Sequence, residues 1–513
     1  MRGRADRSLH LTRRDTLMAK SIWPKSSSSR VDSALSAHSV MGLVISALLF
    51  VLCLSGTVAV FEDEIEWWEQ AETPVVHSVD PAIAQSSAEE VLRRDPETTH
   101  LYMYLPRSDW PRYVVGGDNG MYAVNEAGDF VARLEAPWNE FLIELHYYLT
   151  MPHSFGMIIV AIFGVMLVSM AISGLLAHPR IFRDAFRFKR SGQARLAQVD
   201  LHNRLSVWTT PFLVAVAGTG AMIGLFGVAA LVFAQTNYGG DTNKLSEAIF
   251  GGEVIEPDDS PAPLTGVDTA MINLSRDVED ANPFIIIVHE PGQKSQHIQF
   301  YGDETDRLIY GETYTYSTEG ELLATGHNSD GPVGQQIAMS MYKLHFGDFG
   351  GLWIKAAYFG LGVMLCIIVA TGLNIYFLKR REKGRAAPRL EAMWSGWIWG
   401  STAMLPITLI ASLFGLSVVG LIILFWLGSV AASAVATFAM SAASAGRAFR
   451  AVFGAGLIVA PSIHLLLGRM DWSNAYAVGV TILFAATGAA FLAKAVLSLR
   501  AGRVQPLAPA EAG

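Results

Sequence analysis

Four histidines stand at the starts of long apolar stretches in the 513-residue chain, two in each of two similar halves at about 31–190 and 195–385. His38 and His202 precede apolar runs that end in Gly-Thr, and His146 and His345 form a second matched pair, each directly after a leucine. Ionisable side chains at membrane depth are costly and usually functional. Imidazoles on facing helices hold haem iron inside helix bundles. Two such pairs predict two haems.

The direction of the chain predicts which histidines pair. His38 and His202 begin helices that run outward through the membrane, whereas His146 and His345 begin helices that run back. Because a haem needs two opposed ligands at one depth, we expect His38 to pair with His202 and His146 with His345. Neutral imidazole binds iron through one nitrogen while the other donates a hydrogen bond. Iron with two such ligands has no vacant position, so outer-sphere electron transfer is the expected chemistry.

Two other histidines are weaker candidates. His153 follows His146 by seven residues, on the same face of the expected helix, and could replace it or contact a haem propionate. His178, at the inner end of that helix, could compete with His38 or His202. Neither has an equivalent in the second half of the chain, so both rank below the four.

Other residues near the candidate ligands allow two interpretations each. Small residues at helical spacing indicate either close helix packing or room for a porphyrin face; they include Gly218, Gly220, Gly224, Gly360 and Gly362. Arg204 and Lys343 flank candidate ligands and could pair with haem propionates or anchor at lipid headgroups.

The sequence is that of an α-helical integral membrane protein, because 51% of its residues are hydrophobic and long polar stretches separate the apolar runs. Eight spans are predicted, at about 39–61, 154–177, 207–233, 352–378, 394–413, 416–439, 450–468 and 474–497. Lys and Arg gather in the N-terminal arm, at 180–195, at 379–389 and at 447–450. The positive-inside rule places these segments and both termini in the cytoplasm, and the two long acidic connections outside.

The chain divides into two copies of one plan, at about 31–190 and 195–385, and a C-terminal region. The predicted order is a basic arm at 1–37, a span at 38–61, an external α+β module at 62–145, a span at 146–178, a basic loop at 179–201, a span at 202–233, a second external α+β module at 234–344, a span at 345–378, a basic linker at 379–393, a four-helix membrane region at 394–497 and a tail at 498–513.

This order of helix, α+β module and helix, with His at each helix start and Ser-Gly or Thr-Gly near each helix end, resembles the PepSY-associated transmembrane family over about 31–390. That family includes iron-regulated inner-membrane proteins and ferric-siderophore reductases. The resemblance implies a bacterial inner-membrane protein with two periplasmic PepSY-like modules and two haem b groups. It also implies electron transfer to a periplasmic ferric chelate such as a ferric siderophore. Residues 394–497 carry none of these motifs.

The electron donor is expected to be a separate molecule. The sequence has no Gly-x-Gly-x-x-Gly after a predicted strand and no Walker loop, so we expect quinol or a cytoplasmic reductase as the donor. Membrane lipid is an expected partner and nucleic acid is not. Cys53 and Cys366 are too few for an iron–sulfur cluster.

Two other classes of function compete with a haem reductase. In one, the protein is a non-enzymatic regulator whose PepSY-like modules bind or inhibit a peptidase. In the other, it is a transporter, although the C-terminal spans have no buried acidic residue or broken helix of the kind that marks a substrate site.

Overall fold

In the computed structural model, which describes residues 27–177, 194–241, 244–245, 255–279, 281–303, 307–326, 328–472 and 474–503, eight helices are long and apolar enough to cross a membrane. They are α1 (Ser28–Ala59), α5 (His153–Ala177), α7 (Ala194–Asn237), α11 (Gly351–Glu382), α12 (Pro388–Leu413), α13 (Val418–Ala439), α14 (Ala442–Leu466) and α15 (Ala475–Arg503). The predicted number of spans is confirmed. Gly415 separates α12 from α13 with a φ of 83°, in the left-handed region that glycine adopts readily.

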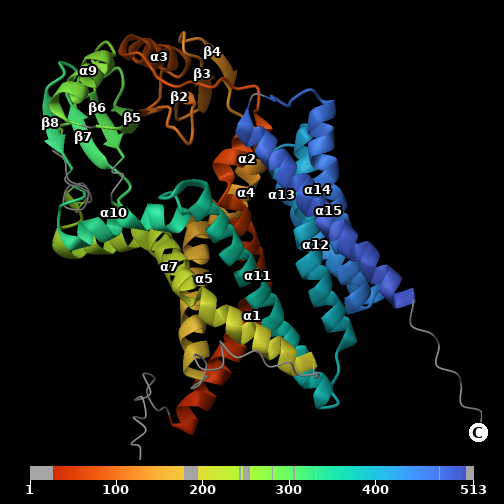
Figure 1. The fold of residues 1–513 in the computed structure, drawn as a ribbon. Coiled ribbons are helices and arrows are strands. Elements are labelled where there is room, and N and C mark those ends of the chain that lie inside the picture. The colour runs from red at the N-terminus through yellow and green to blue at the C-terminus, as the bar shows by residue number, and fades with distance from the viewer. Residues whose placement is uncertain are drawn as a thin grey trace, which may run out of the picture.

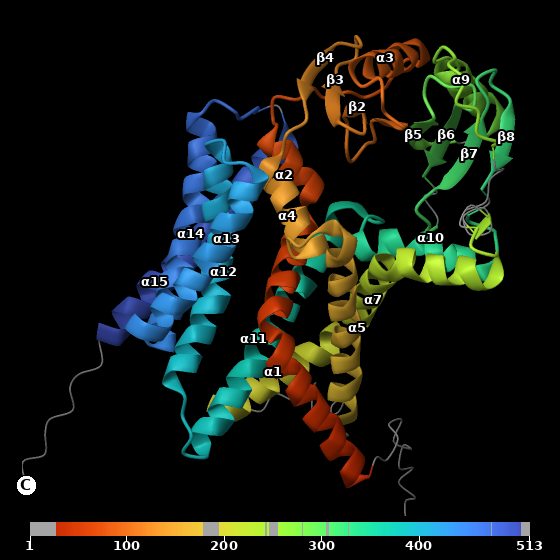
Figure 2. The same ribbon diagram turned by 180° about the vertical axis from the view of Figure 1, so that it is seen from behind.

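The eight helices form two bundles that stand side by side (Figures 1 and 2). In the first bundle, α1 contacts α5 and α11, and α7 contacts the same two helices, so the four close a ring. In the second bundle, α12 packs against α13 and α14, and α14 packs against α15. The two bundles correspond to the repeated halves and to the C-terminal region of the sequence.

Outside the spans, eight short strands form one antiparallel sheet in the order β4-β3-β2-β1-β5-β6-β7-β8. The strands are β1 (His100–Tyr104), β2 (Tyr113–Gly117), β3 (Gly120–Val124), β4 (Phe130–Arg133), β5 (Pro283–His289), β6 (His297–Gly302), β7 (Glu312–Tyr316) and β8 (Leu322–Thr325). The sequence predicts two α+β modules, and both are present. Their edge strands β1 and β5 pair directly, with Met103 opposite Ile286, so the two modules share one sheet.

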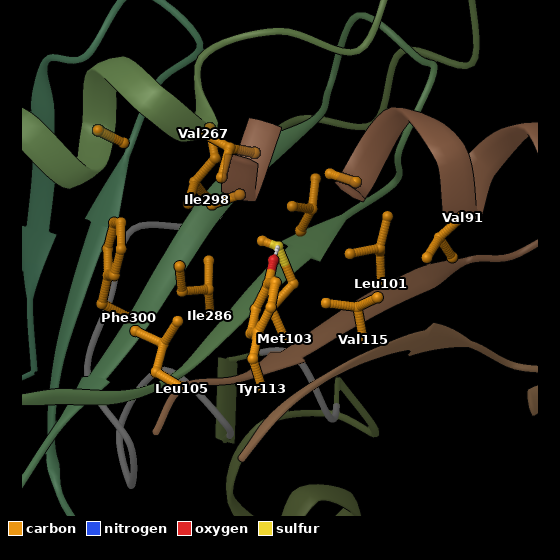
Figure 3. Packing of buried hydrophobic residues seen from close by; sticks show 14 of the residues in the cluster. Val91, Leu101, Met103, Leu105, Tyr113, Val115, Val267, Ile286, Ile298 and Phe300 are labelled. Carbon is orange, nitrogen blue, oxygen red and sulfur yellow. Dashed lines mark hydrogen bonds between the residues drawn. The ribbon is translucent and has the colours of Figure 1, made fainter. Parts of the chain in front are cut away.

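One apolar core serves both halves of the sheet (Figure 3). Alternate strand residues point into it and are buried; among them are Leu101, Met103, Val115, Ile286, Ile298 and Phe300. Two helices, α3 (Pro81–Arg94) and α9 (Val267–Asp277), pack against each other and cover this face through residues such as Val91 and Val267. Burial of each large side chain contributes about 1.5–3 kcal/mol. The shared core therefore makes the two modules one unit.

Short helices join the sheet to the first bundle, and they alter two predicted segments. α2 (Glu62–Glu69) follows α1, α4 (Pro137–Tyr148) precedes α5, and α10 (Val333–Phe346) precedes α11. Leu149 with a φ of 48° ends α4, and Gly347 with a φ of 75° ends α10. His146 and His345 therefore lie in the last turns of short helices. The sequence predicted instead that they begin the spans at 146–178 and 345–378, whereas α5 begins at His153 and α11 at Gly351.

Three histidines lie side by side where the two modules join. His289 on β5 is opposite His100 on β1 and opposite His297 on β6. Its ring centroid lies 5.1 Å from that of His100 and 4.5 Å from that of His297. Burial, and then the neighbouring His297, lower the pKa of His289 to about 4. Protonation of His289 therefore opposes folding of the joined sheet.

Acid should weaken this joint. Between pH 6.5 and 4, the unfolded chain holds a proton on His289 that the folded protein does not, so stability falls as pH falls through this window. For a pKa of about 4, the loss is about 2 kcal/mol at pH 5. The His289→Phe variant should lose less thermal stability than wild type between pH 7.5 and pH 5. Equal losses in the two proteins would show that His289 does not cause the acid sensitivity.

Candidate functional site

The structure brings the four candidate histidines together in two pairs. His38 on α1 and His202 on α7 have ring centroids 6.3 Å apart, with their ring planes at 80°. His146 on α4 and His345 on α10 also have ring centroids 6.3 Å apart, with planes at 22°. We call His38/His202 the inner pair and His146/His345 the outer pair. The outer pair lies at the end of the first bundle that faces the sheet, where Figure 1 shows α4 and α10.

Each of the four rings is anchored by a main-chain carbonyl on a neighbouring helix. The Nδ1 atoms of His38, His146, His202 and His345 lie 2.9, 3.2, 3.0 and 3.0 Å from the carbonyl oxygens of Met170, Leu52, Ile368 and Val216. A carbonyl can only accept, so Nδ1 carries the hydrogen and donates it. The same tautomer leaves the lone pair on Nε2, which is the nitrogen then available to a metal.

A Ser-Gly or Thr-Gly dipeptide completes each anchor. The hydroxyl three residues after the accepting carbonyl lies 3.1–3.4 Å from the same Nδ1, and a glycine follows it. The four dipeptides are Ser55-Gly56, Ser173-Gly174, Thr219-Gly220 and Thr371-Gly372. Positions separated by three and four residues lie on one helix face, so carbonyl, hydroxyl and glycine meet the imidazole together. The sequence marks these dipeptides but not their role as the support of a histidine on another helix.

The glycine of each dipeptide leaves space for the ring. A Cβ atom at Gly56 would lie 2.4 Å from Cε1 of His146, and one at Gly220 would lie 2.6 Å from Cε1 of His345. At Gly174 and Gly372 the corresponding distances are 3.3 and 3.4 Å. A methyl group therefore cannot fit at the outer pair unless the imidazole moves, whereas the inner pair is only tight.

The other glycines noted in the sequence have different roles. A Cβ atom at Gly224 would lie 2.9 Å from Cβ of Ala161 on α5, and one at Gly362 would lie 2.5 Å from Oγ1 of Thr57 on α1. These two glycines permit close helix packing. Gly218 and Gly360 have nothing within 4 Å of an added Cβ atom. Of the five, only Gly220 faces a candidate ligand.

These contacts predict a graded effect of alanine substitutions. Gly220→Ala should displace His345 and reduce stability by about 1–3 kcal/mol, as overpacking does in cores. Gly372→Ala should have a smaller effect. Gly218→Ala, on the same helix as Gly220, is the matched control and should be neutral or stabilising, because alanine favours helices over glycine. The thermal midpoints of the three variants and of wild type measure this order of stability. A Gly220→Ala protein indistinguishable from Gly218→Ala would contradict the proposed contact.

The contacts between histidines and neighbouring helices follow the same pattern in both halves. His38 on α1 contacts α5, and α1 in turn receives His146. His202 on α7 contacts α11, and α7 in turn receives His345. On both α1 and α7, the histidine and the receiving hydroxyl, Ser55 or Thr219, are 17 residues apart in the numbering (55 − 38 and 219 − 202). At a rise of about 1.5 Å per residue, the two levels are roughly 25 Å apart along these helices.

The two weaker candidates do not join these pairs. His146 and His153 were expected to share one helical face, but the break after Tyr148 puts them on separate helices. That His153 replaces His146 or contacts a haem propionate stays a prediction. His153 stacks on Tyr148 and its Nε2 lies 2.7 Å from Oε1 of Glu144, with 64% of its side chain exposed. His178 lies outside the described residues.

The two basic residues that flank the candidate ligands have carboxylate partners. Arg204 is buried, and its Nε lies 2.9 Å from Oδ2 of Asp200. Lys343 forms an ion pair with Asp303. Neither partner was anticipated from the sequence.

The donor set fits a haem held by two imidazoles. With iron–nitrogen bonds of about 2 Å on either side, two axial imidazoles hold their ring centres roughly 6 Å apart. Both pairs have centroids at 6.3 Å, and both have the Nδ1 atoms turned toward carbonyls. The residues that would hold two haems are therefore His38 with His202 and His146 with His345.

The fold and these paired histidines are those of a membrane protein with two repeated halves, and each half has two spans and contributes half of a shared α+β sheet. The chain belongs to the PepSY-associated TM region family, whose pattern matches residues 35–380. The match covers the first bundle and the sheet and ends before α12. An uncharacterized protein of Pseudomonas aeruginosa is 24% identical over 266 residues, which cover 50% of this chain and 67% of that protein.

Proposed function

We propose that this protein is a bacterial inner-membrane electron conduit with two b-type haems, which reduces a ferric chelate such as a ferric siderophore in the periplasm. The observation that carries the proposal is the repeated anchor: two histidine pairs at the same 6.3 Å spacing, with all four Nδ1 atoms hydrogen-bonded to carbonyls. A histidine that only sits at a membrane interface would not need this arrangement four times.

The protein's own groups would set the ligand geometry. The four carbonyls hold each imidazole in the tautomer with a free Nε2, and the hydroxyls of Ser55, Ser173, Thr219 and Thr371 limit ring rotation. Haem iron with two imidazole ligands supplies reversible one-electron transfer and no vacant coordination position.

The orientation follows from charge. The basic segments at 180–195 and 379–389 support a position of the inner pair near the cytoplasm, and the sheet and the outer pair would then face the periplasm. The 25 Å between the levels is close to the thickness of a hydrocarbon core of about 30 Å. Quinol or a cytoplasmic reductase would supply electrons to the inner pair.

The ferric acceptor would receive electrons at the end of the first bundle that faces the sheet. α10, which carries His345, directly follows the second module, so the sheet stands over the end of the bundle where the outer pair lies (Figures 1 and 2). A chelate bound near the sheet would be within reach of the outer pair without entering the membrane. The resemblance to ferric-siderophore reductases supports this choice of acceptor.

The test is the haem content and redox behaviour of the purified full-length protein. A pyridine haemochrome assay should give about two haems b per chain, and a ferric chelate should oxidise the dithionite-reduced protein. A folded protein without haem would exclude electron transfer and favour the non-enzymatic regulator. A haem protein that ferric chelates do not oxidise would have a different acceptor.

A further inference from the structure

A pocket with three cationic side chains opens in the second bundle, outside the part of the chain that the family pattern covers. It has a volume of about 60 Å³ and is lined by Arg447, Arg450, Phe491, Lys494, Ala495 and Ser498, from α14 and α15. The opposite ends of these helices meet α2, where His464 stacks on Trp68 at 4.1 Å. The pocket therefore lies at the end of the bundle away from the sheet.

This end of the bundle is also the one with the basic linker. The hydroxyl of Ser395, near the start of α12, donates to the carbonyl of Ala442 at the start of α14 (2.8 Å). α12 begins at Pro388, at the end of the basic segment 379–389. In the orientation proposed from charge, the pocket faces the cytoplasmic leaflet.

The three cations have no anionic partner in the part of the chain that the structure describes. The ion pairs among those residues include neither Arg447, Arg450 nor Lys494. Arg447 and Arg450 are three residues apart on one helix, where like charges repel. An anion in the pocket would remove this repulsion.

Arg450 is held in place before any ligand arrives. Its Nε donates to the carbonyl of Gly446 (2.6 Å), and its Cζ lies 4.9 Å from the ring centroid of Trp399. Phe491 packs against Phe453 with ring centroids 5.0 Å apart and forms an apolar wall beside the cations. The terminal nitrogens of Arg450 remain as donors, in the fork geometry that matches phosphate oxygens.

We propose that this pocket binds a phosphate group at the cytoplasmic surface of the membrane. Three cationic side chains line one cavity, and together they favour an anion with several oxygens. The apolar wall and the position at a helix end fit the phosphodiester of an anionic phospholipid headgroup, which basic pockets between membrane helices commonly bind. Free phosphate has the same recognition chemistry, and the experiment separates the two sources.

The test is a thermal-shift titration of the full-length protein in neutral detergent, with phosphatidylglycerol, phosphatidylcholine or inorganic phosphate. Phosphatidylglycerol should stabilise wild type, and phosphatidylcholine should not. The Arg447→Gln/Lys494→Gln double variant leaves the contact of Arg450 with Trp399 intact and should bind phosphatidylglycerol about 30-fold more weakly. Arg450→Lys keeps the charge but loses the fork and should also bind more weakly. Arg389→Gln removes an exposed charge at the same end of the bundle and should bind like wild type.

Each outcome decides the proposal. Stabilisation by phosphatidylglycerol alone, lost in the double variant, supports a lipid headgroup site. An equal effect of inorganic phosphate, lost in the same variant, supports a site for free phosphate. An unchanged response in the double variant, or an equal loss in Arg389→Gln, would overturn the proposal.

Discussion

Replacing His146 or His345 with alanine should lower the haem content from about two to about one per chain, and both variants should lose the same haem. The reason is that the two ring centroids lie 6.3 Å apart, so each ring would supply one of the two axial ligands of the proposed outer haem. His38→Ala and His202→Ala should each remove the other haem. The pyridine haemochrome assay measures the loss.

The ring planes allow the two losses to be told apart. The planes of the inner pair are at 80° and those of the outer pair at 22°. Low-spin ferric haem with nearly perpendicular imidazoles gives a strongly anisotropic EPR signal, whereas nearly parallel imidazoles give a rhombic one. We expect the rhombic signal to disappear in His146→Ala and His345→Ala, and the anisotropic signal to disappear in the inner variants.

His153→Ala is the matched control for this series. His153 is only seven residues from His146 in the sequence, but it is exposed and contacts Glu144. Both haems should remain in this variant. If His153→Ala loses a haem while His146→Ala keeps two, the break between α4 and α5 does not separate their roles and the ligand assignment is wrong.

The repeated histidines show which features a sequence of this kind can predict. Their positions in two similar halves and the alternating direction of the spans predict the pairs His38/His202 and His146/His345, because topology alone fixes their depth. The eight spans were equally predictable, since apolar length and charge bias decide them. The role of each Ser-Gly or Thr-Gly dipeptide was not, because it depends on which helix lies opposite.

Other features depended on contacts that local sequence does not specify. The pairing of β1 with β5 joins two edge strands, and an edge offers its hydrogen bonds to any strand of suitable register. The end of α4 is formed by Leu149 in a left-handed conformation, without the glycine that marks the end of α10. The partners of Arg204 and Lys343 likewise required the folded chain.

The largest functional effect should be that the haem of the outer pair is oxidised by the ferric acceptor, whereas the haem of the inner pair alone is not. In proteoliposomes with the sheet facing outward, a membrane-impermeant ferric chelate added outside should oxidise both haems of reduced wild-type protein. In His202→Ala, which retains the outer pair, the remaining haem should still be oxidised. In His345→Ala, which retains only the inner pair, oxidation should fall to the background rate of protein-free leakage, because the remaining haem is about 25 Å farther along the helices.

Proteoliposomes with the sheet facing inward provide the control for the direction of electron transfer. The orientation is measured with an external protease, which cleaves the sheet only where it faces outward. An external chelate should then leave wild-type haem reduced, since it meets only the basic face of the protein. Faster oxidation of His345→Ala than of His202→Ala from the sheet side would mean that the chelate reaches the inner pair first. Oxidation only in the inward-facing vesicles would place the acceptor on the side of the basic segments and reverse the direction of electron flow.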